Sequence, residues 1–189
     1  MTRWPLVVLL AACLLWAADA RDIGDLEELV PGAFEGFTAG EGPYLYPGPE
    51  SLLELYNGGY MVYVDGGVQA ALAQDYYGEE SYYSLVLHAI NTPANAIGMV
   101  AYFRDQISAG FQVNEIELGD GGFEYSFKGT NFLYFSTGDL FVTLQGGQGT
   151  LEAIRSSARD VHERAVPEVW VAATLPLLAI CRRISSNDE

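Results

Sequence analysis

Apolar and polar side chains alternate along much of the second half of the chain, a pattern typical of β-strands. Residues 123–128 (FEYSFK) give the clearest case, because aromatic side chains alternate there with polar ones. We expect the rings to face inward and the polar groups outward. Short turns separate consecutive runs of this kind, which predicts antiparallel pairing. Six strands are expected in all, at residues 68–78, 81–91, 112–118, 123–128, 131–136 and 140–145.

Three segments instead have the apolar spacing of amphipathic helices. Residues 49–65 place apolar side chains four residues apart, but Asn57-Gly58-Gly59 interrupts them. We favour one continuous helix in which the two glycines allow close packing against the sheet, over a helix that ends there before a strand. Residues 93–109 follow an N-cap threonine and contain Gly98 as a second expected point of close contact. Residues 150–165 form the third helix.

The segments before the first helix are expected to be a lead-in. Residues 21–42 contain one turn of apolar helical spacing, and residues 43–49 are extended and rich in proline. Together these elements predict a single α+β domain over residues 21–166, with one antiparallel sheet of about six strands and three principal helices.

The stretch LLELYNGGYMVYVDGGVQ resembles a family of exported bacterial proteins, a domain of unknown function whose core motif reads L-Y-x-Y-I-N-G-G-A. The match is strongest at residues 55–59, and it extends to the segment that contains Pro93, Ala96 and Gly98. Tyr60 departs from it, since the family usually has alanine there, and so does the hydrophobic C-terminus. The resemblance implies a fold and an exported location, and it carries no activity.

The N-terminal residues 1–20 have the pattern of a secretory signal peptide, with Arg3, an apolar run over residues 5–18 and an A-x-A site at residues 18–20. A bacterial lipobox that ends at Cys13 is the alternative, and it would place a lipid there. Either reading predicts export to the periplasm or the cell envelope. Removal of Cys13 leaves Cys181 alone, so no internal disulfide is expected.

The C-terminal segment 167–189 is expected to be an apolar tail. Its apolar residues 169–181 would span about 20 Å as a helix, which is shorter than the bilayer core of about 30 Å. We therefore expect a docked tail or a final strand. A membrane anchor is the alternative, because Arg182 and Arg183 follow the apolar run.

Acidic residues outnumber basic ones by 25 to 9, which gives a formal net charge of −16. Such a surface repels nucleic acid and anionic lipid, so neither is expected as a partner. Membrane contact is expected only through an N-terminal lipid or the C-terminal tail.

Candidate chemistry is sparse. The spacings of zinc-binding histidines and cysteines are missing, so no metal or other cofactor is expected. His88 lies between apolar neighbours in a predicted strand and is expected to be a packed core residue, whereas His162 is expected on a solvated helix face. Residues 146–150 (GGQGT) precede a helix but lack the further features of a phosphate-binding loop. Asp120 and the pair Glu79-Glu80 are interpreted as turn residues rather than calcium ligands.

The strongest functional hint is the run YYGEESYY, which places aromatic doublets on both sides of one hairpin turn. Cross-strand packing at a sheet edge explains such doublets, and so does a recognition patch. We therefore expect an exported, non-enzymatic binding or interaction module for a protein, a peptide or a glycan. The alternative is a periplasmic hydrolase-type enzyme that uses His88 with a carboxylate. The candidate binding residues are Tyr76, Tyr77, Glu79, Glu80, Tyr82 and Tyr83.

Overall fold

The computed structural model describes residues 21 and 23–166; the predicted signal peptide, Cys13 and the C-terminal tail lie outside this part of the chain. Eight strands form one antiparallel sheet in the order β1-β3-β4-β8-β7-β6-β5, and β2 also pairs with β3. The strands are β1 (Thr38–Ala39), β2 (Tyr44–Pro47), β3 (Val68–Tyr77), β4 (Tyr82–Ile90), β5 (Asn114–Ile116), β6 (Gly121–Phe127), β7 (Thr130–Thr137) and β8 (Leu140–Gly146).

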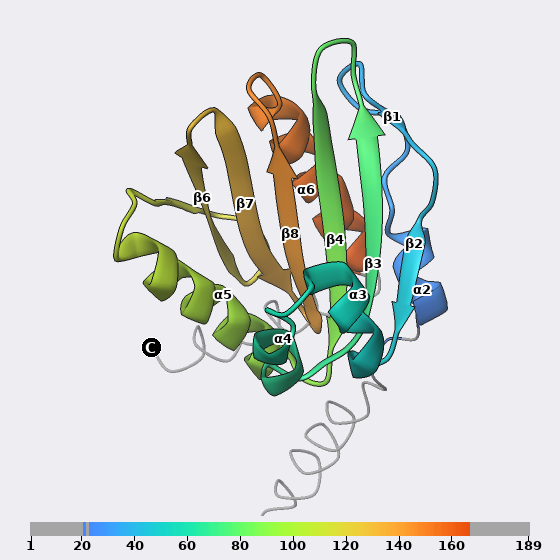
Figure 1. Ribbon diagram of the computed structural model, residues 1–189, viewed down its shortest axis with the longest axis vertical. Helices are drawn as coiled ribbons and strands as arrows, with labels where there is room; N and C mark the ends of the chain where they lie inside the picture. Colours follow the sequence, from blue (N-terminus) through green and yellow to red (C-terminus); the bar gives the residue numbers. More distant parts are fainter. Residues whose placement is uncertain (1–20, 22, 167–189) are drawn as a thin grey trace, which may run out of the picture.

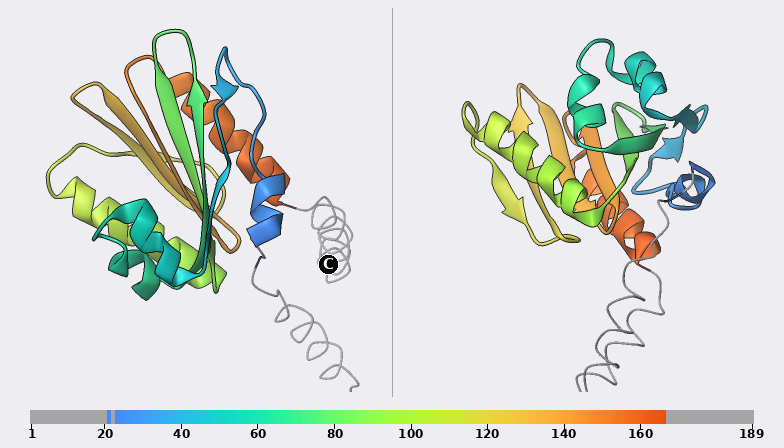
Figure 2. Two further views of the ribbon diagram at one scale, coloured as in Figure 1. Left: turned by 45° about the vertical axis from the view of Figure 1, so that its right-hand side comes forward. Right: turned by 90° about the horizontal axis from the view of Figure 1, so that it is seen from below.

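Helices lie on both faces of the sheet (Figures 1 and 2). We call the face that carries α3, α4 and α5 the front face, and the face that carries α2 and α6 the back face. None of the helices in the described residues is both long and apolar enough to cross a membrane. The helical segments are α2 (Ile23–Glu28), the 3-10 helix η1 (Pro49–Ser51), α3 (Leu52–Tyr56), α4 (Met61–Asp65), α5 (Pro93–Ser108) and α6 (Leu151–Ala165).

Each face of the sheet has its own apolar core. The back core joins Leu26 of α2 and Ile154 of α6 to side chains such as Leu85 of β4. The front core joins Leu52 of α3 and Met99 of α5 to the other side of the same strands. Successive residues of a strand point to opposite faces, so the central strands β4 and β8 supply both cores.

The α+β class and the single antiparallel sheet are confirmed, and all six predicted strands are present within a few residues of their expected ends. The number of strands was wrong, because β1 and β2 add two more. Both are short, and β2 (YLYP) includes a proline that donates no hydrogen bond to a ladder. They stand at the edge of the sheet beside β3, within the segment expected to be an irregular lead-in.

The expectation of one helix over residues 49–65 was wrong, and the alternative of a strand after Gly59 was wrong as well. The chain forms η1, α3 and α4 in succession. Asn57 has a φ of 49° and Gly58 a φ of 132°, and both values are incompatible with a continuing right-handed helix. The break therefore arises from backbone conformation, and it separates α3 from α4.

Close packing occurs at a different glycine pair from the one expected. A Cβ atom added to Gly58 or Gly98 would meet nothing within 4 Å. At Gly66 the added atom would collide with Met99 of α5, and at Gly67 with the side chain of Asn91. The point where the helical segment lies closest to its surroundings is therefore the end of α4.

The expected orientation of residues 123–128 was wrong in part. Glu124 points to the back face, is only 6% exposed, and forms a two-point ion pair with Arg155 of α6 at 2.5 and 2.9 Å. Phe127, expected inside, is 42% exposed. A strand between two helical layers buries a charged side chain where an oppositely charged partner faces it, and hydrophobic patterning alone does not reveal that partner.

Substitution of leucine by alanine should cost much more stability at a buried position than at an exposed one. Leu87, fully buried in the back core, should lose about 2–5 kcal/mol of unfolding free energy on substitution by alanine. Leu53→Ala is the matched control, since Leu53 is 50% exposed, and it should cost less than about 1 kcal/mol. Urea denaturation measures both, and equal costs would contradict the assigned cores.

Candidate functional site

The upper half of the front face carries no helix. α3, α4 and α5 lie in front of the lower half only, whereas α6 lies behind the sheet (Figure 1). Alternate residues of β3 show the difference: Leu72 and Tyr76 on the back face are fully buried, Asp75 on the front face is half-buried, and Tyr77 is 52% exposed. We call this uncovered region the open half. Its floor consists of Asp75, Ser84, Val86, Tyr125, Phe132, Thr143 and Gln145.

The register of the strands brings polar side chains together on this floor. Ser84 of β4 stands opposite Gln145 of β8, and Val86 stands opposite Thr143. On the other side of β8, Thr143 stands opposite Tyr134 of β7. Central strands of a sheet are usually apolar on a covered face, so hydroxyl and amide groups here match a face that meets water or a ligand.

A cavity of about 140 Å³ lies where the open half meets the helices. Tyr56 and Tyr63 form its wall on the side of α3 and α4, and the strands form its floor. Pockets for whole drug-sized ligands are typically about 300–1,000 Å³, so this cavity suits one end of a ligand whose remainder lies on the open half. The lining residues are Tyr56, Tyr63, Ser84, Val86, Tyr134, Thr143, Leu144 and Gln145.

The tyrosines of the cavity belong to a continuous aromatic cluster. The rings of Tyr56 and Tyr63 stack at 3.9 Å between centroids, and Phe103 of α5 links Tyr63 to Tyr134 at 5.5 and 5.6 Å. On the open half, Tyr125 stacks on Phe132 at 4.6 Å. The cluster ties α3, α4 and α5 to the sheet and holds the cavity wall in place.

His88 lies beneath the cavity wall and is completely buried. Its Nδ1 lies 2.8 Å from the carbonyl oxygen of Phe141, so Nδ1 carries the hydrogen and donates it. Its Nε2 then accepts a hydrogen bond from the hydroxyl of Tyr56. Burial lowers the pKa of His88 to about 4, although the Phe141 carbonyl acts in the opposite direction. At neutral pH the ring is therefore neutral, and both nitrogens are occupied.

The tyrosine hydroxyls of the cavity remain protonated at ordinary pH. Burial, followed by the neighbouring hydroxyl of Tyr63, raises the pKa of Tyr56 far above its usual range. Burial, followed by Tyr125, does the same for the pKa of Tyr134. These side chains therefore act as neutral hydrogen-bonding groups rather than as phenolate nucleophiles.

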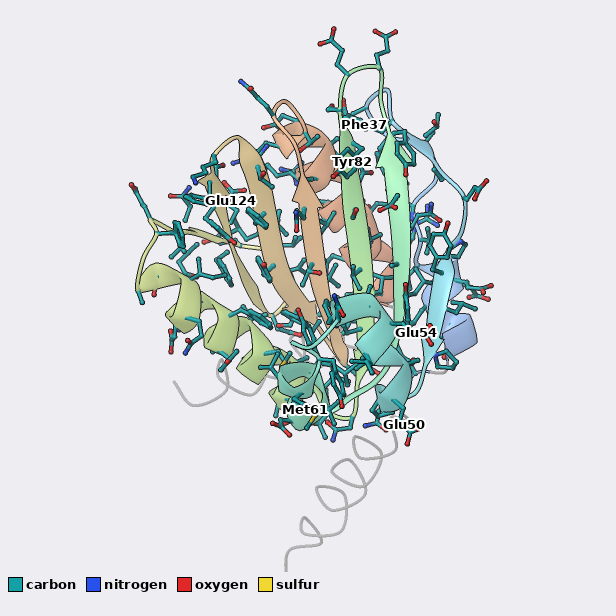
Figure 3. All side chains as sticks on the ribbon, viewed as in Figure 1. Phe37, Glu50, Glu54, Met61, Tyr82 and Glu124 are labelled. Atoms are coloured by element: carbon teal, nitrogen blue, oxygen red, sulfur yellow. The ribbon has the colours of Figure 1, made fainter. Side chains whose placement is uncertain are left out.

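Two carboxylates lie near the cavity on the side of β3. Asp75 accepts a hydrogen bond from the hydroxyl of Ser84 at 2.5 Å, next to the cavity. Glu54 extends from α3 at the side of the sheet where β2 and β3 lie (Figure 3). Burial raises the pKa of Tyr46, and the charges of Glu54 and Asp75 raise it further, so both carboxylates act on the same edge of the site.

The hairpin tyrosines divide between the two faces of the sheet. Tyr76 and Tyr83 are fully buried on the back face, where they stack at 4.7 Å, and the hydroxyl of Tyr76 donates to the carbonyl of Pro31. They are core residues and cannot touch a ligand. Tyr77 and Tyr82 face forward, are more than half exposed, and form a cross-strand pair at 6.2 Å. Glu79 and Glu80 are exposed in the connecting turn.

The other sequence candidates lie away from this site. His162 is half-buried, and its Nδ1 lies 2.9 Å from the hydroxyl of Thr137. In the loop before α6, the hydroxyl of Thr150 donates to the carbonyl of Gly147. Asp120 accepts a hydrogen bond from the backbone of Gly138 in the β7–β8 turn. Within the described residues, no three histidine, cysteine, aspartate or glutamate side chains gather as metal ligands do.

Two larger hollows differ from the cavity in their chemistry. One of about 390 Å³ lies on the back face against Arg155 and Arg159 of α6, and Arg155 already pairs with Glu124 and Glu152. The other, of about 450 Å³, lies between α4 and α5. Neither combines tyrosine hydroxyls, an amide and strand hydroxyls as the cavity of the open half does, and such convergence of polar groups is characteristic of ligand sites.

Sequence reasoning missed the floor and the wall of this site. Ser84, Thr143 and Gln145 are polar residues within otherwise apolar strands, and that signal was present in the sequence. It gains meaning only with the register, which places these side chains on one face. Tyr56 and Tyr63 were expected on a continuous helix, and the break at Asn57 and Gly58 lets two short helices present them.

Comparison with known proteins gives one informative likeness. No protein-family model matches the sequence, and no curated protein matches it. The fold is similar to the crystal structure of the extracellular domain of PknH from Mycobacterium tuberculosis, with a TM-score of 0.53 and 11% sequence identity. The likeness covers 78% of this chain and 97% of that domain. It shows a shared fold, and membership of the family suggested by the glycine motif stays a prediction.

Removing the hydroxyl of Tyr56 should leave Nε2 of His88 buried without a donor. Tyr56→Phe is expected to lower the unfolding free energy by about 1–3 kcal/mol. Tyr82→Phe is the control, because Tyr82 is 57% exposed, and it should change stability by less than about 0.5 kcal/mol. Urea denaturation at pH 7 compares them, and an unchanged Tyr56→Phe variant would show that this hydroxyl is not needed by His88.

The lowered pKa of His88 predicts a loss of stability in mild acid. In the unfolded chain His88 is protonated with a pKa near 6.5, whereas in the native state its pKa is about 4. The unfolded state therefore binds more protons between these values, and the free energy of unfolding falls as the pH drops from above 6.5 toward 4. Between pH 7 and pH 5 the native state loses about 2 kcal/mol of stability through His88.

Unfolding free energies of the wild type and of His88→Gln, measured from pH 7 to pH 5, test this dependence. Carboxylates titrate in both proteins and cancel in the difference. We expect the wild type to lose about 2 kcal/mol relative to the variant over this range. Parallel curves would contradict a buried, neutral His88.

Proposed function

We propose that the protein is an exported ligand-binding domain that holds its ligand on the open half of the front face. The observation that carries the proposal is the cavity at the edge of that half, where Tyr56, Tyr63 and Tyr134 surround the strand groups of Ser84, Thr143 and Gln145. One end of the ligand enters the cavity, and the remainder lies across the uncovered strands toward Tyr77 and Tyr82.

Several features of the open half support a binding role. Aromatic side chains of the open half are exposed or half-buried, whereas helices cover the lower half of the same face. Aromatic and hydroxyl groups together favour ligands that have both apolar and polar parts. Of the six hairpin residues first expected to bind a ligand, four remain candidates, and they lie at the β3–β4 end of the open half: Tyr77, Glu79, Glu80 and Tyr82.

An exported location belongs to the same proposal. The similar fold of an extracellular domain supports it, as does the signal-peptide pattern of residues 1–20. We further propose that the domain acts at the cell envelope or in the periplasm.

A hydrolase that uses His88 gains no support from the geometry. The two ring nitrogens contact Phe141 and Tyr56 rather than a carboxylate, and the buried ring does not line the cavity. A general base at neutral pH works best with a pKa near the operating pH, whereas that of His88 is about 4. We therefore propose a binding domain without a catalytic role for His88.

Filling the cavity should abolish binding to the open half. Methyl glucoside, choline and a neutral tetrapeptide serve as probes of three ligand classes, observed by backbone amide NMR. We expect at least one probe to shift the resonances of Ser84, Thr143 and Gln145 in the wild type, and to bind at least tenfold more weakly to Thr143→Trp.

The matched control is Glu117→Trp, which adds the same side chain at the hollow on the back face. It should bind as the wild type does. The proposal fails if none of the three probes shifts resonances of the open half, or if Thr143→Trp retains full affinity while it remains folded.

A further inference from the structure

The chemistry of the cavity also indicates what kind of group it accepts. We propose that the open half binds an organic cation, with an ammonium group held in the cavity among the tyrosines beside Asp75. This inference rests on the proposed binding function and adds the class of ligand to it. It depends on three observations: the groups that line the cavity, the carboxylates around it, and the position of the basic residues.

The cavity offers rings and oxygen atoms and no positive charge. Its eight lining residues contain three tyrosines, two further hydroxyls and one side-chain amide, and none of them is charged. The faces of aromatic rings attract cations, and the attraction grows when the cation leaves water. Hydroxyl and amide oxygens accept hydrogen bonds from a primary ammonium group. A quaternary ammonium group has no N–H, and the partial negative charge of the same oxygens and of the rings attracts it instead. A volume of about 140 Å³ suits such a head group.

Two carboxylates lie beside the cavity on the side of β3. Asp75 is half-buried and is held by the hydroxyl of Ser84, itself part of the cavity lining. Glu54 stands on α3 above the same edge, and its charge reaches Tyr46 together with that of Asp75. Two carboxylates on one side of a tyrosine-lined cavity give it a negative potential that favours a cation and disfavours a phosphate or a carboxylate ligand.

The basic residues of the described chain are mostly engaged elsewhere. Arg21 pairs with Asp139, and Arg104 pairs with Asp105 and Glu115. Helix α6, which carries the remaining described arginines, lies behind the sheet (Figures 1 and 2).

Lys128 lies in the β6–β7 turn, with its ammonium over the ring of Phe127. Four strand spacings of about 4.8 Å separate the strand of Asp75 from β6, which is roughly 19 Å. That exceeds the screening length of about 8 Å at physiological salt, so Lys128 does not neutralise Asp75.

A pair of isosteric probes tests the charge directly. Choline carries a trimethylammonium group, and 3,3-dimethylbutan-1-ol has the same shape with a neutral carbon in place of nitrogen. Titrations followed by backbone amide NMR should show choline shifting the resonances of Ser84 and Thr143. We expect the neutral analogue to bind at least tenfold more weakly, and choline binding to weaken as salt is raised.

Asp75→Asn is the decisive variant, because asparagine keeps an oxygen for the hydroxyl of Ser84 and removes the charge. It should weaken choline about tenfold and leave the neutral analogue unchanged. Glu117→Gln is the control, since it removes one carboxylate at the back-face hollow, and it should alter choline binding by less than twofold.

N-acetyl-lysine methylamide in a parallel titration distinguishes a free quaternary amine from the lysine side chain of a peptide. Binding of either cation that depends on Asp75 supports the inference, and failure of both overturns it. If choline and its neutral analogue bind equally well, the preference for a cation is wrong and the proposed binding function is retained. If methyl glucoside or the tetrapeptide binds where both cations fail, the inference alone is wrong. If every probe fails, the proposed function fails with it.

Discussion

The sheet has two faces, and the helices of the fold cover only one of them completely. The rest of the structure follows from that constraint. α6 and α2 close the back face, where Tyr76, Tyr83 and Leu85 are fully buried. On the front face, α3, α4 and α5 reach only the lower half (Figure 1). The side chains of the upper half must therefore be compatible with water, which explains why Ser84 and Gln145 occur in the central strands.

The candidate site forms at the boundary between the covered and the uncovered half. Tyr56 and Tyr63 come from α3 and α4, and the turn between these helices allows their rings to stack. The Tyr56 hydroxyl is fixed by His88, whose other nitrogen is fixed by the backbone of β8. A buried histidine thus positions a wall residue of the cavity. Its neutrality matters for this role, because a protonated Nε2 could not accept the hydrogen bond.

Local sequence signals were sufficient for the sheet but insufficient for the site. Strands such as β3 and β4 were predictable because apolar runs and turn residues are local features. The break at Asn57 depends on a left-handed conformation that apolar spacing does not reveal, and the burial of Glu124 depends on Arg155, which is distant in sequence. The site requires both the register and the extent of helical cover. Ser84 becomes informative only once it is known to stand opposite Gln145 on an uncovered face.

The net charge of −16 gains a more specific meaning from the structure. On its own, an acidic balance indicates little beyond solubility. The fold, however, pairs most of its described arginines with carboxylates at the lower end of the sheet, on the back face and along α5. Asp75 and Glu54 lie beside the tyrosines of the front face. Asp75 and Glu54 therefore place negative charge beside the uncovered part of the sheet. A low-dielectric cavity wall strengthens such a field, so positively charged ligands would be attracted to this face and anionic ones repelled.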